Sequence, residues 1–145
     1  MYSESKESLY FPVYSDNELV LFSTRYFGNN KDHPKTIIMG KTSNVLNIMG
    51  KGSKLVLTED VVSAIKVSKI TAAMPLYGCN LQRRTVDMLQ KLPYNKIVLW
   101  LDPDKRKESM LQARKYKPLL PIETVFSDGD PKEIPLQQIK TMLQY

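Results

Sequence analysis

The stretch IVLWLDPDKRKE, residues 97–108, decides the fold class of the chain. Its first five residues form a continuous apolar run, which is typical of a strand that is buried on both faces of a sheet. Asp102 and Asp104 follow that run with one proline between them, and a basic segment begins directly afterwards. The sequence therefore places two carboxylates and several cations together at the end of a buried strand.

Strand-like and helix-like segments alternate from residue 54 to residue 145. The strand-like runs are KLVLT, TAAMP, KIVLWL and IETVF, and a segment with helical spacing follows each of them. This alternation predicts an α/β fold with a mostly parallel sheet flanked by helices, in which ligands bind outside the carboxyl ends of the strands. Asn80 is placed to cap the helix that follows TAAMP.

The first 53 residues have a different pattern. Residues 9–14 and 18–26 are predicted to form two strands joined by a Ser-Asp-Asn turn, and residues 35–40 a third short strand. The segment GKGSK, residues 50–54, has the composition of a linker. We therefore predict a small β-rich element over residues 1–53 and an α/β domain over residues 54–145.

Composition narrows the classes of function. The formal charge of +6 and the pI of about 9.3 suit a polyanionic partner such as nucleic acid without requiring one. No apolar run approaches the ~20 residues that span a bilayer, and the N-terminus lacks an apolar signal-peptide core, so we expect no membrane association and a cytoplasmic location. A single cysteine, Cys79, and a single histidine, His33, argue against a zinc site within the chain.

Carboxylates follow two of the predicted strands. Glu59 stands just beyond KLVLT, and Asp102 and Asp104 stand just beyond KIVLWL. If these strands are neighbours in a parallel sheet, the three side chains converge on one edge, where they could bind Mg²⁺, which takes one or two carboxylates plus waters and substrate phosphates. Taken singly, Glu59 could cap a helix and Asp-Pro-Asp could form a turn. Their occurrence at two strand ends favours the metal site.

The ordered segments resemble a known family. KLVLTEDVVSAIKV and KIVLWLDPDK resemble the two motifs of the Toprim domain, a strand that ends in glutamate and a strand that ends in Asp-x-Asp. AMPLYGCNLQRRTVDMLQKL and VFSDGDPKEIP resemble later segments of this domain in bacterial and phage DNA primases. FPVYSDNELVLFSTRYFGNNKDHPKTI resembles the end of the basic subdomain that precedes it. The resemblance covers nearly the whole chain from Leu9.

The resemblance implies a DNA primase catalytic core, a DNA-directed RNA polymerase and nucleotidyltransferase of DNA replication. Such an enzyme uses Mg²⁺ or Mn²⁺ to synthesise RNA primers from ribonucleoside triphosphates on a single-stranded DNA template, and it works with a helicase or other replication proteins. The chain is expected to be a minimal or truncated primase without a zinc module. A phage-encoded form would act in the host cytoplasm.

Individual roles carry over from the family by motif. Glu59, Asp102 and Asp104 would be catalytic residues and metal ligands, and Asp128 and Asp130 match the later acidic positions that ligate metal. Arg25 and Lys35 match basic positions that hold template or nucleotide phosphates. The positive charges that follow Asp104, beginning with Lys105 and Arg106, form either a solvated helix face or a surface that binds phosphates at the lip of the metal site.

Several positions depart from the family pattern. Asp60 stands where glycine usually follows the glutamate, Ser63 stands where bacterial primases often carry another aspartate, and Ser23 and Thr24 replace glycines before Arg25. Two alternatives to primer synthesis stay open, and the small size of the chain together with Asp60 and Ser63 favours the second of them. One is a Toprim-type nuclease that uses the same carboxylates. The other is a catalytically inactive Toprim module that binds nucleic acid or a replication protein.

Overall fold

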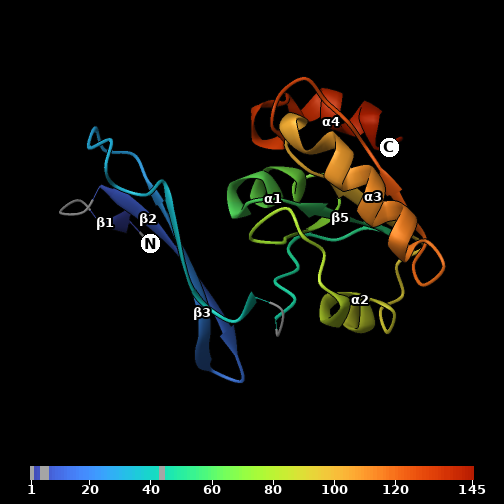
Figure 1. Ribbon diagram of the computed structural model, residues 1–145, viewed down its shortest axis with the longest axis horizontal. Coiled ribbons are helices and arrows are strands. Elements are labelled where there is room, and N and C mark those ends of the chain that lie inside the picture. The colour runs from blue at the N-terminus through green and yellow to red at the C-terminus, as the bar shows by residue number, and fades with distance from the viewer. Residues whose placement is uncertain (1, 4–6, 43–44) are drawn as a thin grey trace. The chain divides into compact units, whose positions relative to one another are not determined.

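The structure is a computed structural model that describes residues 2–3, 7–42 and 45–145. It divides the chain into two compact units, Met1–Val45 and Leu46–Tyr145 (Figure 1). Each unit contains its own four-stranded β-sheet, antiparallel in the first unit and parallel in the second.

The boundary between the units lies between Val45 and Leu46, eight residues before the boundary that the sequence predicts, which is between residues 53 and 54. The backbone N–H and C=O of Met49 are hydrogen-bonded to the C=O and N–H of Ala73, each at 2.8 Å. Leu46 and Ile48 are partly buried against the core of the second unit. The segment that precedes the predicted linker therefore packs with the α/β unit, because its backbone and its apolar side chains find their partners there.

The first unit is an antiparallel sheet in the order β1-β2-β3-β4. Its strands are β1 (Tyr2–Ser3), β2 (Ser8–Ser15), β3 (Glu18–Tyr26) and β4 (Thr36–Gly40). The two-residue turn between β2 and β3 consists of Asp16 and Asn17, which have φ values of 52° and 65°. Asp and Asn tolerate this left-handed conformation better than most residues, so the turn predicted from Ser-Asp-Asn forms the hairpin.

The second unit alternates strands and helices as the sequence predicts. Its elements are β5 (Lys54–Thr58), α1 (Val61–Val67), β6 (Ala72–Pro75), α2 (Arg83–Leu89), β7 (Lys96–Trp100), the 3₁₀ turn η3 (Pro103–Lys105), α3 (Arg106–Tyr116), β8 (Ile122–Thr124), the 3₁₀ turn η4 (Pro131–Glu133) and α4 (Leu136–Met142). All neighbouring strands are parallel, in the order β6-β5-β7-β8. The predicted fold class, α/β with a parallel sheet flanked by helices and a β-rich N-terminal element, is confirmed.

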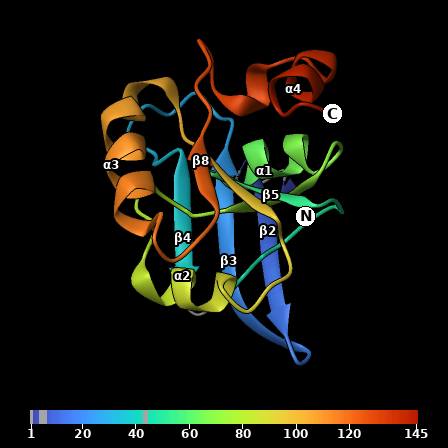
Figure 2. The ribbon, with the colours of Figure 1, turned by 90° about the vertical axis from the view of Figure 1, so that its right-hand side faces the viewer.

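Helices cover both faces of the parallel sheet (Figure 2). Because side chains alternate along a strand, Leu55 and Leu57 of β5 pack in the cluster that includes α2 and α3 residues, and Val56 packs in the cluster that includes α1 and α4 residues. Trp100 of β7 lies in the second cluster and is fully buried. Burial on both faces explains why these strands are continuous apolar runs in the sequence.

Helix α2 begins later than the sequence predicts. Asn80 is not its cap, since the helix starts at Arg83 and the capping position is Gln82, whose side chain makes no capping hydrogen bond. The side chain of Gln112 on α3 accepts a hydrogen bond from the Leu81 N–H and donates one to the Cys79 C=O. These contacts fix residues 79–81 to α3, so the helix starts only beyond them.

The strand order has a topological switch point between β5 and β7, at the centre of the parallel sheet. Strands β5 and β7 are neighbours, but the chain leaves β5 toward β6 on one side and leaves β7 toward β8 on the other side. In open α/β sheets, loops that depart in opposite directions from two neighbouring strands mark the usual place of a ligand site, at the carboxyl ends of those strands. Ligands of open α/β sheets bind at such a switch point, and the chain places acidic residues there.

Candidate functional site

Glu59 and Asp102 meet at the switch point. Thr58, the last residue of β5, lies level with Trp100, the last residue of β7, so both acidic residues emerge at the same edge. The backbone N–H of Asp102 donates a hydrogen bond to Oε2 of Glu59 at 3.3 Å. The predicted convergence of carboxylates from two strand ends is therefore observed for this pair.

Asp102 is held where its negative charge is unfavourable. Burial raises the pKa of Asp102 to about 7, with further contributions from the charges of Glu59 and Asp130, and the Lys132 ammonium opposes them only in part. Its Oδ1 is buried and lacks a hydrogen-bond partner within the described ranges of the chain. A carboxylate oxygen in this state is well suited to accept a proton or a cation.

A lysine joins two other carboxylates of this edge. The Nζ of Lys132 lies 2.9 Å from Oδ2 of Asp60 and 3.1 Å from Oδ2 of Asp130. Burial alone would raise the pKa of Asp60, but a hydrogen bond from the Ser63 N–H and the contact with Lys132 hold it below its usual value. Burial likewise acts to lower the pKa of Lys132, and the two carboxylates raise it instead. Asp60 and Lys132 therefore stay charged, and the Lys132 ammonium is paired with both Asp60 and Asp130.

The same turn places an aspartate after β7 and after β8. Asp102 precedes Pro103 with φ −62° and ψ 153°, and Asp130 precedes Pro131 with φ −63° and ψ 148°. A residue before proline favours this extended conformation, and proline suits the first position of the helical turn that follows. Each Asp-Pro pair thus begins a 3₁₀ turn, and its aspartate occupies the capping position of that turn.

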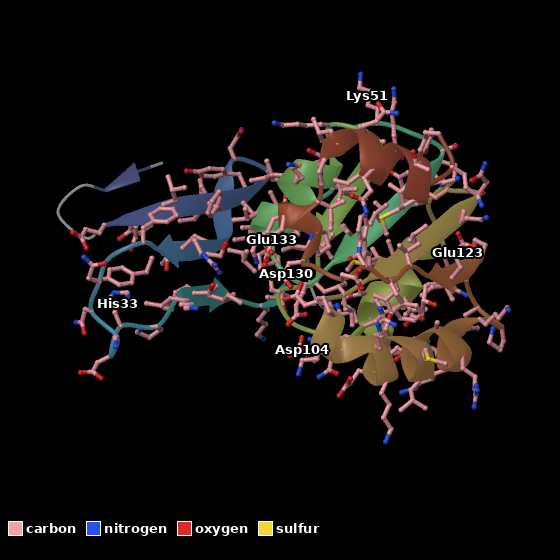
Figure 3. The ribbon with its side chains drawn as sticks, turned by 90° about the horizontal axis from the view of Figure 1, so that it is seen from above. His33, Lys51, Asp104, Glu123, Asp130 and Glu133 are labelled. Carbon is pink, nitrogen blue, oxygen red and sulfur yellow. The ribbon has the colours of Figure 1, made fainter. Side chains whose placement is uncertain are left out.

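Two other predicted acidic residues, Asp104 and Asp128, are more exposed to solvent than Asp102. Asp104 is exposed on the turn η3, and Figure 3 shows it at the same end of the second unit as Asp130, whereas Glu123 lies at the opposite end. Asp128 is exposed in the loop after β8. That loop is fixed to β7 because the Trp100 indole N–H donates to Oγ of Ser127 at 2.8 Å.

The predicted phosphate-binding residues lie in two places. Lys105 ends η3, and Arg106 begins α3 with its guanidinium over the ring of Phe126, 5.3 Å from the ring centre. Arg25 and Lys35 belong to the first unit, where Arg25 on β3 is paired with Thr36 of β4 and the Lys35 C=O accepts a hydrogen bond from the backbone of β3. Lys105 and Arg106 thus lie within four residues of Asp102, just beyond the end of β7.

Two residues of the site were not recognised from the sequence. Asp60 caps α1 through a hydrogen bond of 2.7 Å from the Ser63 N–H to its Oδ1, and Lys132 bridges Asp60 to Asp130. One feature of the sequence points to Lys132. The pattern Asp-Pro-x-x occurs twice, as DPDK after the strand KIVLWL and as DPKE after the strand IETVF, and each copy contains a lysine.

Known proteins add no information on identity. Comparison of the chain with models of protein families, with curated proteins and with solved structures finds no match. Among the helices that the structure describes, none has the length and apolar character needed to cross a membrane. Within the described residues no three His, Cys, Asp or Glu side chains are grouped as a ready-made metal cage. The strand-end carboxylates, with their geometry and charge, are therefore the feature of the molecule that points to a function.

Proposed function

We propose that the chain is the catalytic core of a Toprim-type DNA primase, which joins ribonucleotides on a single-stranded DNA template. The observation that carries this proposal is the contact between Glu59 and the Asp102 backbone at the switch point of the parallel sheet. Open α/β sheets bind their ligands at this point. The resemblance of the strand-end motifs to those of Toprim domains supports the same assignment.

The acidic edge fits the Mg²⁺ or Mn²⁺ ion that this function requires. The buried Oδ1 of Asp102 has no hydrogen-bond partner among the described residues and is available as a metal ligand, and the Glu59 carboxylate accepts a hydrogen bond from the backbone of the same residue. Mg²⁺ typically takes one or two protein carboxylates and completes its shell with waters and phosphates. Glu59 and Asp102 would hold the ion, with Asp104 as a third candidate. When bound, such an ion neutralises a triphosphate and favours attack by a 3′-hydroxyl.

The net positive charge of the chain falls on the unit that carries the acidic edge. Residues 1–45 carry five basic and five acidic residues, so the whole net charge of +6 falls on residues 46–145. Lys105 and Arg106, next to the strand end that carries Asp102, would bind the phosphates of the incoming nucleotide. Arg25 and Lys35 of the first unit would bind phosphates of the template. Arginine and lysine are the usual partners of nucleic-acid phosphates.

An assay of primer synthesis tests the proposal. The intact chain, mixed with single-stranded DNA, labelled ribonucleoside triphosphates and Mg²⁺ or Mn²⁺, should make short RNA products, and EDTA should abolish them. Synthesis depends on the metal because the carboxylates and the phosphates are both negatively charged, and a cation is needed between them. The absence of any product on a range of templates would contradict the proposal. Metal-dependent degradation of the DNA would instead favour a nuclease, and binding without turnover would favour an inactive module.

A further inference from the structure

We propose that Lys132 occupies a cation position inside the acidic site and thereby limits the site to one divalent ion. This inference rests on the proposed function, because it concerns how the same carboxylates are divided between a metal and the protein. Two observations support it: the position of the lysine ammonium between two carboxylates, and the lack of a hydrogen-bond partner for Oδ1 of Asp102 among the residues that the structure describes.

The Lys132 ammonium contacts both carboxylates directly. It lies 2.9 Å from Asp60 and 3.1 Å from Asp130, and all three side chains are largely removed from solvent, with 21%, 22% and 26% of their side-chain surfaces exposed. The contact links η4 to the start of α1, two elements far apart in the sequence. An ammonium in this position supplies the positive charge that two adjacent carboxylates otherwise take from a metal ion.

The hydrogen bonds sort the acidic residues into two classes. Both oxygens of Asp60 are in use, one for the Ser63 N–H and one for Lys132, and Asp130 is bonded to the same lysine. Asp102 has a free buried oxygen, and the Glu59 carboxylate beside it contacts only a backbone N–H among the described residues. The protein thus supplies its own cation to one pair of carboxylates and leaves the other pair for a ligand.

A count of bound Mn²⁺ tests this division without any measurement of activity. Titration of the full chain, followed by calorimetry and by the spin resonance signal of free Mn²⁺, should give one ion for the wild type and two for Lys132→Met. The second ion binds because Asp60 and Asp130 lose their internal cation. Lys140→Met is the matched control, since it removes an equal charge from the exposed surface of α4 and should leave the count at one.

Each outcome of the titration bears on the inference. One ion in both the wild type and Lys132→Met, or two ions in the wild type, would overturn it and leave the proposed function standing. No ion in the wild type and one in Lys132→Met would overturn the inference as well, because the wild-type site would then hold no divalent ion, and would also contradict a metal-dependent wild-type enzyme. No ion in either protein would overturn both proposals.

A second variant, Asp130→Asn, keeps the lysine in place. It tests whether Asp130 binds the lysine or the metal, even if Lys132→Met fails to fold. Asp130→Asn should still bind one Mn²⁺, weakened by less than about tenfold through the loss of a nearby charge. The reason is that Asp130 serves the lysine and not the metal. Complete loss of Mn²⁺ binding in Asp130→Asn would make that residue a metal ligand and overturn the inference.

Discussion

Asp102→Asn should lower primer synthesis by at least about 100-fold, because a metal ligand supplies several kcal/mol of transition-state stabilisation. The substitution removes one negative charge and one oxygen from the pair that Asp102 forms with Glu59, and it changes the shape of the side chain very little. Product formation at saturating Mg²⁺ and nucleotide measures the effect.

The fold should survive this substitution. The Asp102 side chain makes no capping hydrogen bond to η3, and its Oδ1 has no partner in the described part of the chain, so asparagine breaks no existing bond. Far-UV circular dichroism of the variant should match the wild type. Asp87→Asn on α2 is the control, because it makes the same chemical change at an exposed residue, which is paired with Arg83 at 2.9 Å. If Asp102→Asn keeps the activity of this control, Asp102 does not hold the metal.

The same substitution should stabilise the protein at pH 8 in the absence of divalent ions. In the folded state the pKa of Asp102 is about 7, above its ordinary value of 3.8, so the folded protein binds a proton more tightly than the unfolded chain. Stability is therefore lost as the pH rises from about 4 to about 7, and the loss is complete above that range. Asparagine cannot ionise and escapes the loss.

The expected gain is about 1–2 kcal/mol in the free energy of unfolding. For a fully buried group, a rise in pKa from 3.8 to about 7 would correspond to about 4 kcal/mol in the free energy of unfolding. Asp102 is half-exposed, so solvent screens much of this effect. Urea denaturation at pH 8 and at pH 4 measures it, and the gain should vanish at the lower pH. Asp87→Asn should change stability by less than about 0.5 kcal/mol at either pH.

A gain at pH 8 would have a functional meaning. A side chain that costs stability in its ionised form is retained for something other than the fold, and active sites are the usual places for such residues. An equal stability of Asp102→Asn and wild type at pH 8 would show that the charge of Asp102 is tolerated, and the argument from its burial would fail.

The second unit could be predicted from the sequence to a large extent. Its strands are short, continuous apolar runs, and helical spacing follows each of them, so that periodicity alone predicts an α/β sheet. The pairing of Glu59 with Asp102 follows from the ends of two such runs together with one further condition. The condition is that β5 and β7 are neighbours, which the structure satisfies.

Contacts between distant residues could not be predicted in this way. The start of α2 depends on Gln112, whose side chain bonds the chain near Leu81, 31 residues earlier. The partnership of Lys132 with Asp60 joins residues that are 72 positions apart. Local propensity does not record these contacts, because each arises only when α1, α3 and η4 have already packed on the sheet. The sequence therefore does not predict the pairing of Asp60 with Lys132.

The melting temperature of the chain in Mg²⁺ tests the central claim most directly, namely that Glu59 and Asp102 form a site for a divalent cation. At a Mg²⁺ concentration ten times the dissociation constant, binding stabilises the folded state by about 1.4 kcal/mol. The melting temperature of the wild type and of Asp87→Asn should then rise by several degrees, and that of Asp102→Asn should stay within about one degree of its value in EDTA. No rise in the wild type, or an equal rise in Asp102→Asn, would contradict the claim.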